Sequence, residues 1–220
     1  MTDCQLGHTD HELITVPTRV GPMRVYNSAP YMDIAEPGLC PARHAVCDRL
    51  RAEGSWEAHD TTVIRSILEV GNRDKIVVDF GANCGWYTLL AAGYGYRVVA
   101  VEYEDAFIEL LHENVALNHV QDRVTIIQAW VDEAFTLSDP GVDVELIKVD
   151  LEGADKFAVE ACWPWVNRVN GWWIEISPEF RDDYPHLVNR LTGIGFAARY
   201  PDGREFDGDY RHQLNLWFSR

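Results

Sequence analysis

Continuous apolar runs alternate with amphipathic stretches along most of the chain. The stretch at 75–80, "KIVVDF", contains a continuous apolar run and does not alternate between apolar and polar residues, which is typical of a strand buried on both faces. In the stretch 104–119, Ile108, Leu111 and Val115 recur at helical spacing, with charged residues between them. This alternation predicts βαβ units, each a strand followed by a helix and a parallel strand.

The same pattern extends to the end of the chain. We predict strands over residues 75–80, 96–102, 123–131, 144–153, 171–177, 195–200 and 213–220. Helices are predicted over residues 59–71, 86–95, 104–119, 154–163 and 184–195, the last broken near Pro185. Right-handed crossovers then give an α/β fold with helices on both faces of a seven-stranded, mostly parallel sheet. The last two strands have no helix between them, so one strand is expected to be antiparallel.

The first fifty or so residues differ from the rest of the chain. The stretch 23–34 alternates loosely and carries the turn formers Asn27, Ser28 and Pro30, which predicts a short hairpin. A short helix is expected to follow, with Pro41 at its start and Gly54 after its end. We predict residues 1–54 as a cap and residues 55–220 as the core of a single domain.

Composition and charge narrow the classes of protein. The chain has 220 residues, of which 19 are basic and 35 acidic, so its net charge is −16. Such a surface repels phosphate groups, and we therefore expect neither nucleic acid nor a membrane as a partner. The N-terminus lacks the basic start and apolar segment of a secretory signal, and the five scattered cysteines resemble free thiols. These features predict a cytoplasmic protein.

The turn after the first predicted core strand is the most informative stretch. Gly81 and Gly85 allow a sharp bend, and the next helix directs its first N–H groups into the same space. The third glycine of a dinucleotide-binding pattern is missing, and the Lys-Ser/Thr pair of a phosphate-binding loop is missing too. Asp79 precedes the turn, where its carboxylate would repel a pyrophosphate and suit a ligand with an amino group and a positive centre.

A second acid, Glu102, ends the next predicted strand and could accept hydrogen bonds from both hydroxyls of a ribose. An adenosine, an amino acid and a positive charge together describe S-adenosylmethionine, which we predict as the cofactor. The alternative is that Asp79 caps the turn and Glu102 is a solvated strand end. After the third strand, Trp130 and Asp132 are predicted to contact the adenine, with core packing as the alternative for Trp130. Cys84 is interpreted as a small filler.

The later strands also end in charged residues. Lys148 and Asp150 share one face of their strand, and Glu175 and His212 are expected at the same edge of the sheet. We predict Asp150, Glu175 or His212 as the base and Lys148 as the residue that orients the acceptor. A structural ion-pair network of Lys148, Asp150 and Glu175 is the alternative, and His212 alone could be a surface histidine.

A resident metal ion is not expected. Asp150 and Glu175 offer oxygen ligands for a divalent cation, but the sequence supplies no obvious further ligand. The histidines in "HTDH" at 8–11 have a spacing open to a metal, although they stand in a terminal segment.

Several motifs in this order resemble the FkbM-type S-adenosylmethionine-dependent methyltransferases. They are "VVDFGANCGWYTLL", "VVAVEYED", "HENVALNH" and "IKVDLEGAD", preceded by "GSWEAHD". The resemblance implies methylation of hydroxyl oxygens in sugars and natural products. It implies cofactor binding by Asp79, Gly81, Asn83, Gly85 and Glu102, and an acceptor bordered by Lys148, Asp150 and Glu152. With it we assign Trp56, Glu57, Thr88, Tyr103, Trp130, Asp132 and Asp150 to the cofactor site as well.

The sequence therefore predicts an O-methyltransferase acting on a small molecule or glycan. Three alternatives stay open: an NAD-dependent oxidoreductase, a ribose 2'-O-methyltransferase acting on RNA, and a binding module that has lost catalysis. The oligomeric state, a homodimer included, is not fixed by the sequence.

Overall fold

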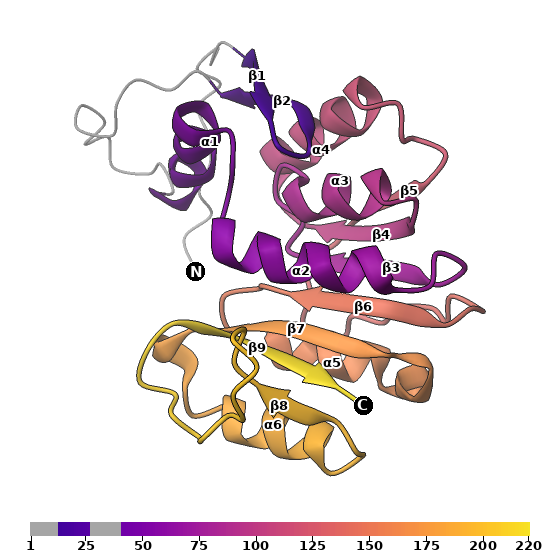
Figure 1. Cartoon of the computed structure of the whole chain (residues 1–220), viewed down its shortest axis with the longest axis vertical. Helices are drawn as coiled ribbons and strands as arrows, with labels where there is room; N and C mark the ends of the chain where they lie inside the picture. Colours follow the sequence, from indigo (N-terminus) through magenta and orange to yellow (C-terminus); the bar gives the residue numbers. More distant parts are fainter. Residues whose placement is uncertain (1–12, 27–40) are drawn as a thin grey trace.

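The computed structural model describes residues 13–26 and 41–220. Its main sheet has seven strands, ordered β5-β4-β3-β6-β7-β9-β8, which Figure 1 shows from top to bottom. Their bounds are β3 Ile76–Phe80, β4 Arg97–Glu102, β5 Val124–Gln128, β6 Val144–Val149, β7 Gly171–Ile176, β8 Ala197–Arg199 and β9 Leu214–Ser219. Pairing is parallel except at β9, which runs antiparallel to both of its neighbours, β7 and β8. The predicted α/β class and sheet are confirmed.

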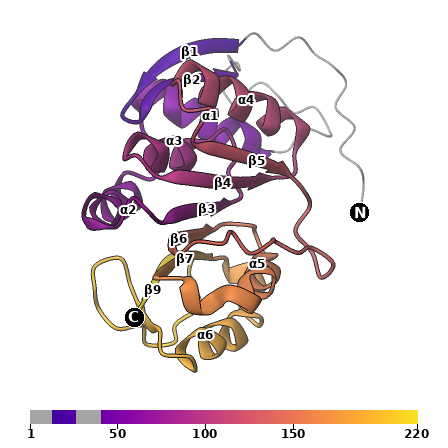
Figure 2. The same cartoon turned by 90° about the vertical axis from the view of Figure 1, so that its right-hand side faces the viewer.

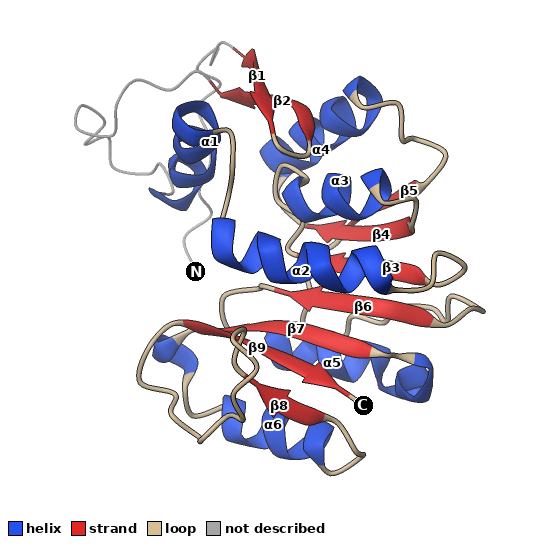
Figure 3. Cartoon of the chain, viewed as in Figure 1, coloured by secondary structure: helices blue, strands red, loops and turns tan. Residues whose placement is uncertain are grey.

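Helices cover both faces of this sheet (Figures 2 and 3). Their bounds are α1 Pro41–Glu53, α2 Ala58–Val70, α3 Trp86–Gly93, α4 Asp105–Leu117, α5 Asp155–Cys162 and α6 Tyr184–Thr192, with short 3-10 turns at Trp163–Arg168 and Pro178–Phe180. The helices α2, α3 and α4 pack on one face around Leu68, Leu90 and Leu111, in what we call the first core. The helices α5 and α6 bury Val159 and Leu187 on the opposite face, in the second core.

The N-terminal hairpin lies earlier in the sequence than predicted. Its strands are β1 Leu13–Thr18 and β2 Gly21–Tyr26, and the predicted turn residues Asn27, Ser28 and Pro30 lie outside the described residues. The turn instead uses the Thr18 hydroxyl, which donates to the Gly21 carbonyl and accepts from the Val20 N–H. Local side-chain hydrogen bonds of this kind can make a turn without Asn or Pro.

Two further details refine the predictions. The hairpin and α1 contribute Met23, Val25 and Leu50 to the first core, so they share packing with the sheet. Pro185 does not break a helix, because it stands in the first turn of α6, where its missing N–H leaves no hydrogen bond unmade. Among the described residues, no helix is long and apolar enough to cross a membrane.

Strand order and side-chain alternation together create one charged edge. The order in which successive strands are added to the sheet reverses between β3 and β6, and ligands of open α/β sheets bind at such a point, beyond the carboxyl ends of the strands. Asp79 is paired in register with Lys148 on one side and with Ala100 on the other. Because side chains alternate, Asp79, Glu102, Lys148 and Glu175 all lie on the face of the first core, near the ends of β3, β4, β6 and β7.

Candidate functional site

Asp79 sits at the centre of the charged edge. Its side chain is buried, and the Thr88 hydroxyl donates to Oδ2 over 2.7 Å. Its other oxygen, Oδ1, has no hydrogen-bond partner in the described part of the chain. Burial raises the pKa of Asp79, opposed by the nearby Lys148 ammonium. A buried carboxylate oxygen without a partner is costly, so Asp79 is suited to a donor that a ligand brings.

The turn after β3 has no room for a side chain at Gly81, because the backbone that follows β6 packs directly against it. Gly81 has φ +76°, and a Cβ added to it would overlap the backbone carbonyl oxygen of Asp150. The sequence indicated that Gly81 lets the backbone approach a ligand, but the close approach found here is to Asp150. Asn83 also has a positive φ, 52°, and its side-chain oxygen accepts from the Cys84 N–H over 2.7 Å. Gly85, with φ 99°, is the N-cap residue immediately before α3.

Glu102 holds the same turn from the neighbouring strand. Its Oε2 accepts from the Asn83 N–H over 2.8 Å. Its Oε1 accepts from the backbone N–H groups of Tyr103, over 2.7 Å, and Glu104, over 3.0 Å. Burial raises the pKa of Glu102, whereas these donors oppose the rise. The carboxylate is oriented by backbone groups, and Oε2, which accepts only one of these bonds, has a further lone-pair direction for a ligand hydroxyl.

Trp130 and Tyr103 form an exposed aromatic pair beside Glu102. Their ring centroids are 4.5 Å apart and the rings are nearly perpendicular, at 82°. Trp130 is 59% exposed and Tyr103 is 51% exposed, so core packing does not account for Trp130. Asp132 accepts from the Ala134 N–H over 2.9 Å, which makes it part of a local turn. Exposed rings at the mouth of a site are suited to covering a planar group such as a nucleobase.

Lys148 is buried next to three carboxylates. Its Nζ donates to Asp150 Oδ2 over 3.1 Å and lies 5.0 Å from the centre of the Tyr87 ring. Burial disfavours the charged ammonium, but Asp150, Asp79 and Glu57 together raise the pKa of Lys148. The side chain therefore keeps its proton at neutral pH and can act only as a hydrogen-bond donor and a positive charge.

Glu175 comes next along the edge, on β7. Its Oε1 accepts a hydrogen bond from the Gln213 amide. Burial and the neighbouring Asp150 raise the pKa of Glu175 to about 8. A carboxyl group with such a pKa can exchange a proton at physiological pH, which is the property expected of a general acid or base.

Glu57 enters the site from the start of α2. Its backbone has φ 39° and ψ 62°, a left-handed conformation that is uncommon for a residue other than glycine. Its Oε2 accepts from the Tyr87 hydroxyl over 2.6 Å, and burial raises the pKa of Glu57. Trp56, the residue before it, is half-buried and packs against the first core.

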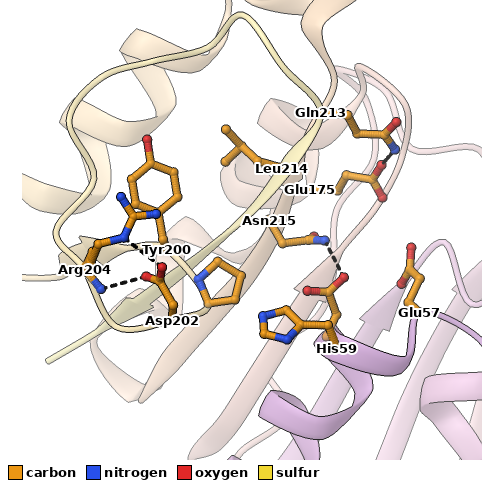
Figure 4. A pocket seen from close by; sticks show the side chains of 11 residues that line it. Glu57, His59, Glu175, Tyr200, Asp202, Arg204, Gln213, Leu214 and Asn215 are labelled. Carbon is orange, nitrogen blue, oxygen red and sulfur yellow. Dashed lines mark hydrogen bonds and ion pairs between the residues drawn. The ribbon is translucent and has the colours of Figure 1, made fainter.

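A cavity of about 420 Å³ opens where α2, β7, β9 and the loop 200–213 meet (Figure 4). The side chains lining it are Glu57, His59, Asp60, Glu175, Tyr200, Pro201, Asp202, Arg204, Gln213, Leu214 and Asn215. Asn215 donates to Asp60 over 3.2 Å and is paired in register with Glu175, so it ties α2 to the strand ends. The volume suits a single small molecule or one unit of a larger one.

The structure brings most of the predicted residues together, with one clear exception. Asp79, Glu102, Lys148, Asp150 and Glu175 share one edge of the sheet. His212 is exposed in the loop and is not among the cavity-lining residues of the described chain, which does not favour it as a base. The loop follows β8 as predicted, but its path directs Gln213 toward Glu175 instead.

The sequence did not point to several residues of the site, among them four with polar contacts there. Tyr87, Asp60, Gln213 and Asn215 all contact predicted site residues or line the cavity. Only Asn215 had a signal in the sequence, since an antiparallel last strand would place its polar side chain opposite the end of β7. The segment 8–11 lies outside the described residues, and within them no three His, Cys, Asp or Glu side chains are grouped to hold a metal ion.

These groups fit S-adenosylmethionine. The partnerless oxygen of Asp79 can accept from an amino group, Glu102 Oε2 can accept from a ribose hydroxyl, and two exposed rings lie beside Glu102. The surplus of carboxylates around Lys148 also favours a ligand that carries positive charge.

Comparisons with known proteins identify the fold. Residues 56–149 match the family model described as the TRM5/TYW2 methyltransferase domain. A TehB-like SAM-dependent methyltransferase from Corynebacterium glutamicum shares 14% identity at a TM-score of 0.56, over 80% of this chain and 95% of that one. The precorrin-6y C5,15-methyltransferase of Geobacter metallireducens shares 14% identity at a TM-score of 0.52, over 73% and 86%. No curated protein matches the chain.

A third similar structure corrects one prediction. The complex of aTrm5 and tRNALeu shares 18% identity at a TM-score of 0.55 and covers 97% of this chain, which spans 54% of that one. Together with the TRM5/TYW2 match, it overturns the expectation that nucleic acid is excluded as a partner. That expectation was drawn from net charge, which averages the whole surface, whereas binding depends on the charge near one site.

The comparisons do not support the FkbM subtype that the motifs suggested, since the matching family model is another one. They support a methyltransferase at the coarser level, and they imply S-adenosylmethionine as its cofactor. The chain has the fold of the class I S-adenosylmethionine-dependent methyltransferases.

Proposed function

We propose that the protein transfers a methyl group from S-adenosylmethionine to a hydroxyl oxygen of an acceptor bound in the cavity beside Glu175. The observation that carries this proposal is the pair formed by Glu175, whose pKa is raised to about 8, and the permanently charged Lys148 on the next strand. One group can remove a proton and the other can stabilise the negative charge left on oxygen.

The cofactor would lie over the ends of β3 and β4. Asp79 is assigned to its amino group and Glu102 to its ribose hydroxyls, with Trp130 and Tyr103 beside the adenine. Thr88 supports Asp79 through the hydrogen bond of 2.7 Å, and Asn83 supports Glu102 through the one of 2.8 Å. When bound, the cofactor supplies a methyl group already activated by its sulfonium.

The acceptor would enter from the cavity side. Ionised Glu175 would take the proton of the acceptor hydroxyl, and the bound cofactor would supply the methyl group to that oxygen. Gln213 holds the Glu175 carboxylate through its amide. Lys148, fixed by Asp150, donates toward the reacting oxygen. Most of the rate enhancement would come from holding the reacting groups in line.

Calorimetry with S-adenosylhomocysteine tests the cofactor assignment first. We expect binding with a stoichiometry of one per chain, and absence of binding at millimolar ligand would contradict the proposal. Incubation with S-adenosylmethionine and a panel of sugars, small hydroxylated compounds and RNA, followed by mass spectrometry, then identifies the acceptor. A product that gains one methyl group on oxygen supports the proposal, whereas methylation on nitrogen or carbon contradicts it.

RNA is the second candidate acceptor. It is favoured by the TRM5/TYW2 family match and by the similarity to the aTrm5 complex with tRNALeu. A gel shift with structured RNA at low salt, together with the RNA arm of the acceptor panel, separates it from a free small molecule. The methyltransferase comparisons also favour both candidates over the NAD-dependent oxidoreductase.

A further inference from the structure

Tyr87 connects two charged groups that come from different parts of the fold. It stands in the first turn of α3 and is 7% exposed. Its hydroxyl donates to Glu57 Oε2 over 2.6 Å, and the face of its ring lies 5.0 Å from the Lys148 ammonium. The ring thereby links the start of α2 to the end of β6.

Glu57 requires such support. Its left-handed backbone, with φ 39°, costs about 1 kcal/mol or more in a residue with a side chain. Burial favours the neutral form of its carboxyl group and raises its pKa. The Lys148 charge and the Tyr87 hydroxyl both act in the opposite direction and favour the ionised form. The Glu57 carboxylate is therefore kept charged in part by a neutral neighbour.

We propose that Tyr87 is a positioning residue of this site, which holds the Glu57 carboxylate through its hydroxyl and the Lys148 ammonium through its ring, so that both face the bound cofactor and acceptor. This inference rests on the proposed function. Tyr87 itself is given no contact with the reacting atoms, and it acts through the two charged groups.

The charge on Glu57 affects cofactor binding in a pH-dependent way. The charged and titratable groups around Glu57 are Lys148, Tyr87, Asp150 and Asp60, and Glu175 and His59 line the same cavity. Without the Tyr87 hydroxyl, the pKa of Glu57 rises further, so Glu57 becomes neutral at a higher pH. A neutral Glu57 attracts the ammonium group of the cofactor less strongly, and binding then weakens at a higher pH than in the wild type.

The test compares three tyrosine variants by calorimetry with S-adenosylhomocysteine between about pH 5 and pH 9. Tyr87→Phe removes only the hydroxyl, and Tyr87→Leu also removes the ring beneath Lys148. Tyr96→Phe is the matched control, because Tyr96 is buried in the same core and its hydroxyl donates to a backbone carbonyl, that of Leu68, over 3.0 Å. The carboxylate nearest in effect to Tyr96 is Glu145, which lies at the start of β6 and so at the end opposite to the site.

We expect Tyr87→Phe to weaken binding about threefold at alkaline pH and about tenfold at acidic pH, because a hydrogen bond to a charged group is lost. Tyr87→Leu should bind more weakly still, whereas Tyr96→Phe should follow the wild type. Glu57→Gln provides a variant that leaves Tyr87 in place. It should bind weakly with a flatter pH profile, and adding Tyr87→Phe to it should have no further effect.

Two results would overturn the inference. One is a Tyr87→Phe profile that matches the Tyr96→Phe profile at every pH. The other is a full effect of Tyr87→Phe in the Glu57→Gln background. In both cases the wild type still binds S-adenosylhomocysteine, whereas failure of the proposed function is marked by a wild type that does not bind it.

Discussion

Asp79 and Glu102 lie on the same face of neighbouring parallel strands, Asp79 as the last but one residue of β3 and Glu102 as the last residue of β4. Asp79 is paired in register with Ala100, and Glu102 follows two positions later on the same side of β4. Two hydrogen bonds connect these acids to the turn after β3 and the helix that follows it. The Thr88 hydroxyl donates to Asp79, and the Asn83 N–H donates to Glu102. Two acids can bind different parts of one cofactor only if their side chains lie on the same face of the sheet, and these two do.

Removing the exposed ring of Trp130 is predicted to affect binding and not stability. Trp130→Ala should weaken S-adenosylhomocysteine binding about tenfold, because stacking on one aromatic ring contributes about 1–3 kcal/mol. The ring is 59% exposed, so the free energy of unfolding should change by no more than about 0.5 kcal/mol. Calorimetry and thermal unfolding measure the two quantities. Val70→Ala is the control for loss of an exposed apolar side chain, since Val70 is 85% exposed and is the last residue of α2, before β3 begins. Equal binding by Trp130→Ala and the wild type would contradict the adenine assignment.

Glu175 is predicted to set a pH dependence of both activity and stability. Its pKa is raised to about 8, so turnover should rise as pH increases through that value, and Glu175→Gln should lose that rise. The carboxyl group binds its proton more tightly in the folded chain than in the unfolded one. Its contribution to stability is therefore complete below the unfolded pKa of about 4.5 and is lost as pH rises to about 8.

Glu175→Gln cannot ionise, and it should be more stable than the wild type at alkaline pH by a few degrees in Tm. The difference should shrink toward acidic pH. Differential scanning calorimetry across this range checks the sign, and a Glu175→Gln variant that is less stable than the wild type at alkaline pH would contradict it.

Substituting Gly81 and Gly203 by alanine distinguishes the cost of steric overlap from the cost of backbone strain. Both have positive φ values, +76° and +88°, but a Cβ on Gly81 overlaps the Asp150 carbonyl, whereas a Cβ on Gly203 meets no described atom within 4 Å. Gly203→Ala should therefore cost only about 1 kcal/mol of unfolding free energy, from strain alone. Gly81→Ala should cost about 3 kcal/mol or more, because the β3 turn and the end of β6 must separate. Denaturant titrations of the two variants should differ accordingly, and equal losses would show that the crossing is not tightly packed.

The sequence predicted the sheet because its strands carry their own signal. Continuous apolar runs such as Ile76 to Val78 are stable only when they are buried on both faces, and the acids near their ends, such as Asp79, are visible without a structure. Contacts made across the fold carry no such local signal. Tyr87 looks like one more apolar position of α3, and its role follows only from where Glu57 and Lys148 lie.

The hairpin and the last loop show the same limit. The turn at Thr18 depends on hydrogen bonds of the Thr18 hydroxyl, which the sequence pattern did not predict. Asp202 and Asp209 each accept hydrogen bonds from an arginine two residues later, which shapes the loop 200–213 locally. Gln213 lines the cavity and its amide donates to Glu175, whereas His212 is not among the lining residues, and periodicity alone could not predict this difference.

The central claim is that Asp79 binds a cationic cofactor at the carboxyl edge of β3. Calorimetry with S-adenosylhomocysteine on the wild type, Asp79→Asn and Glu145→Gln tests it most directly, because Glu145 is also a buried carboxylate but lies at the opposite end of its strand, β6. We predict that Asp79→Asn weakens binding at least about tenfold, the loss expected when a charged hydrogen bond is removed, and that Glu145→Gln binds as the wild type does. Equal affinity for Asp79→Asn and the wild type, or absence of binding by the wild type itself, would contradict the account.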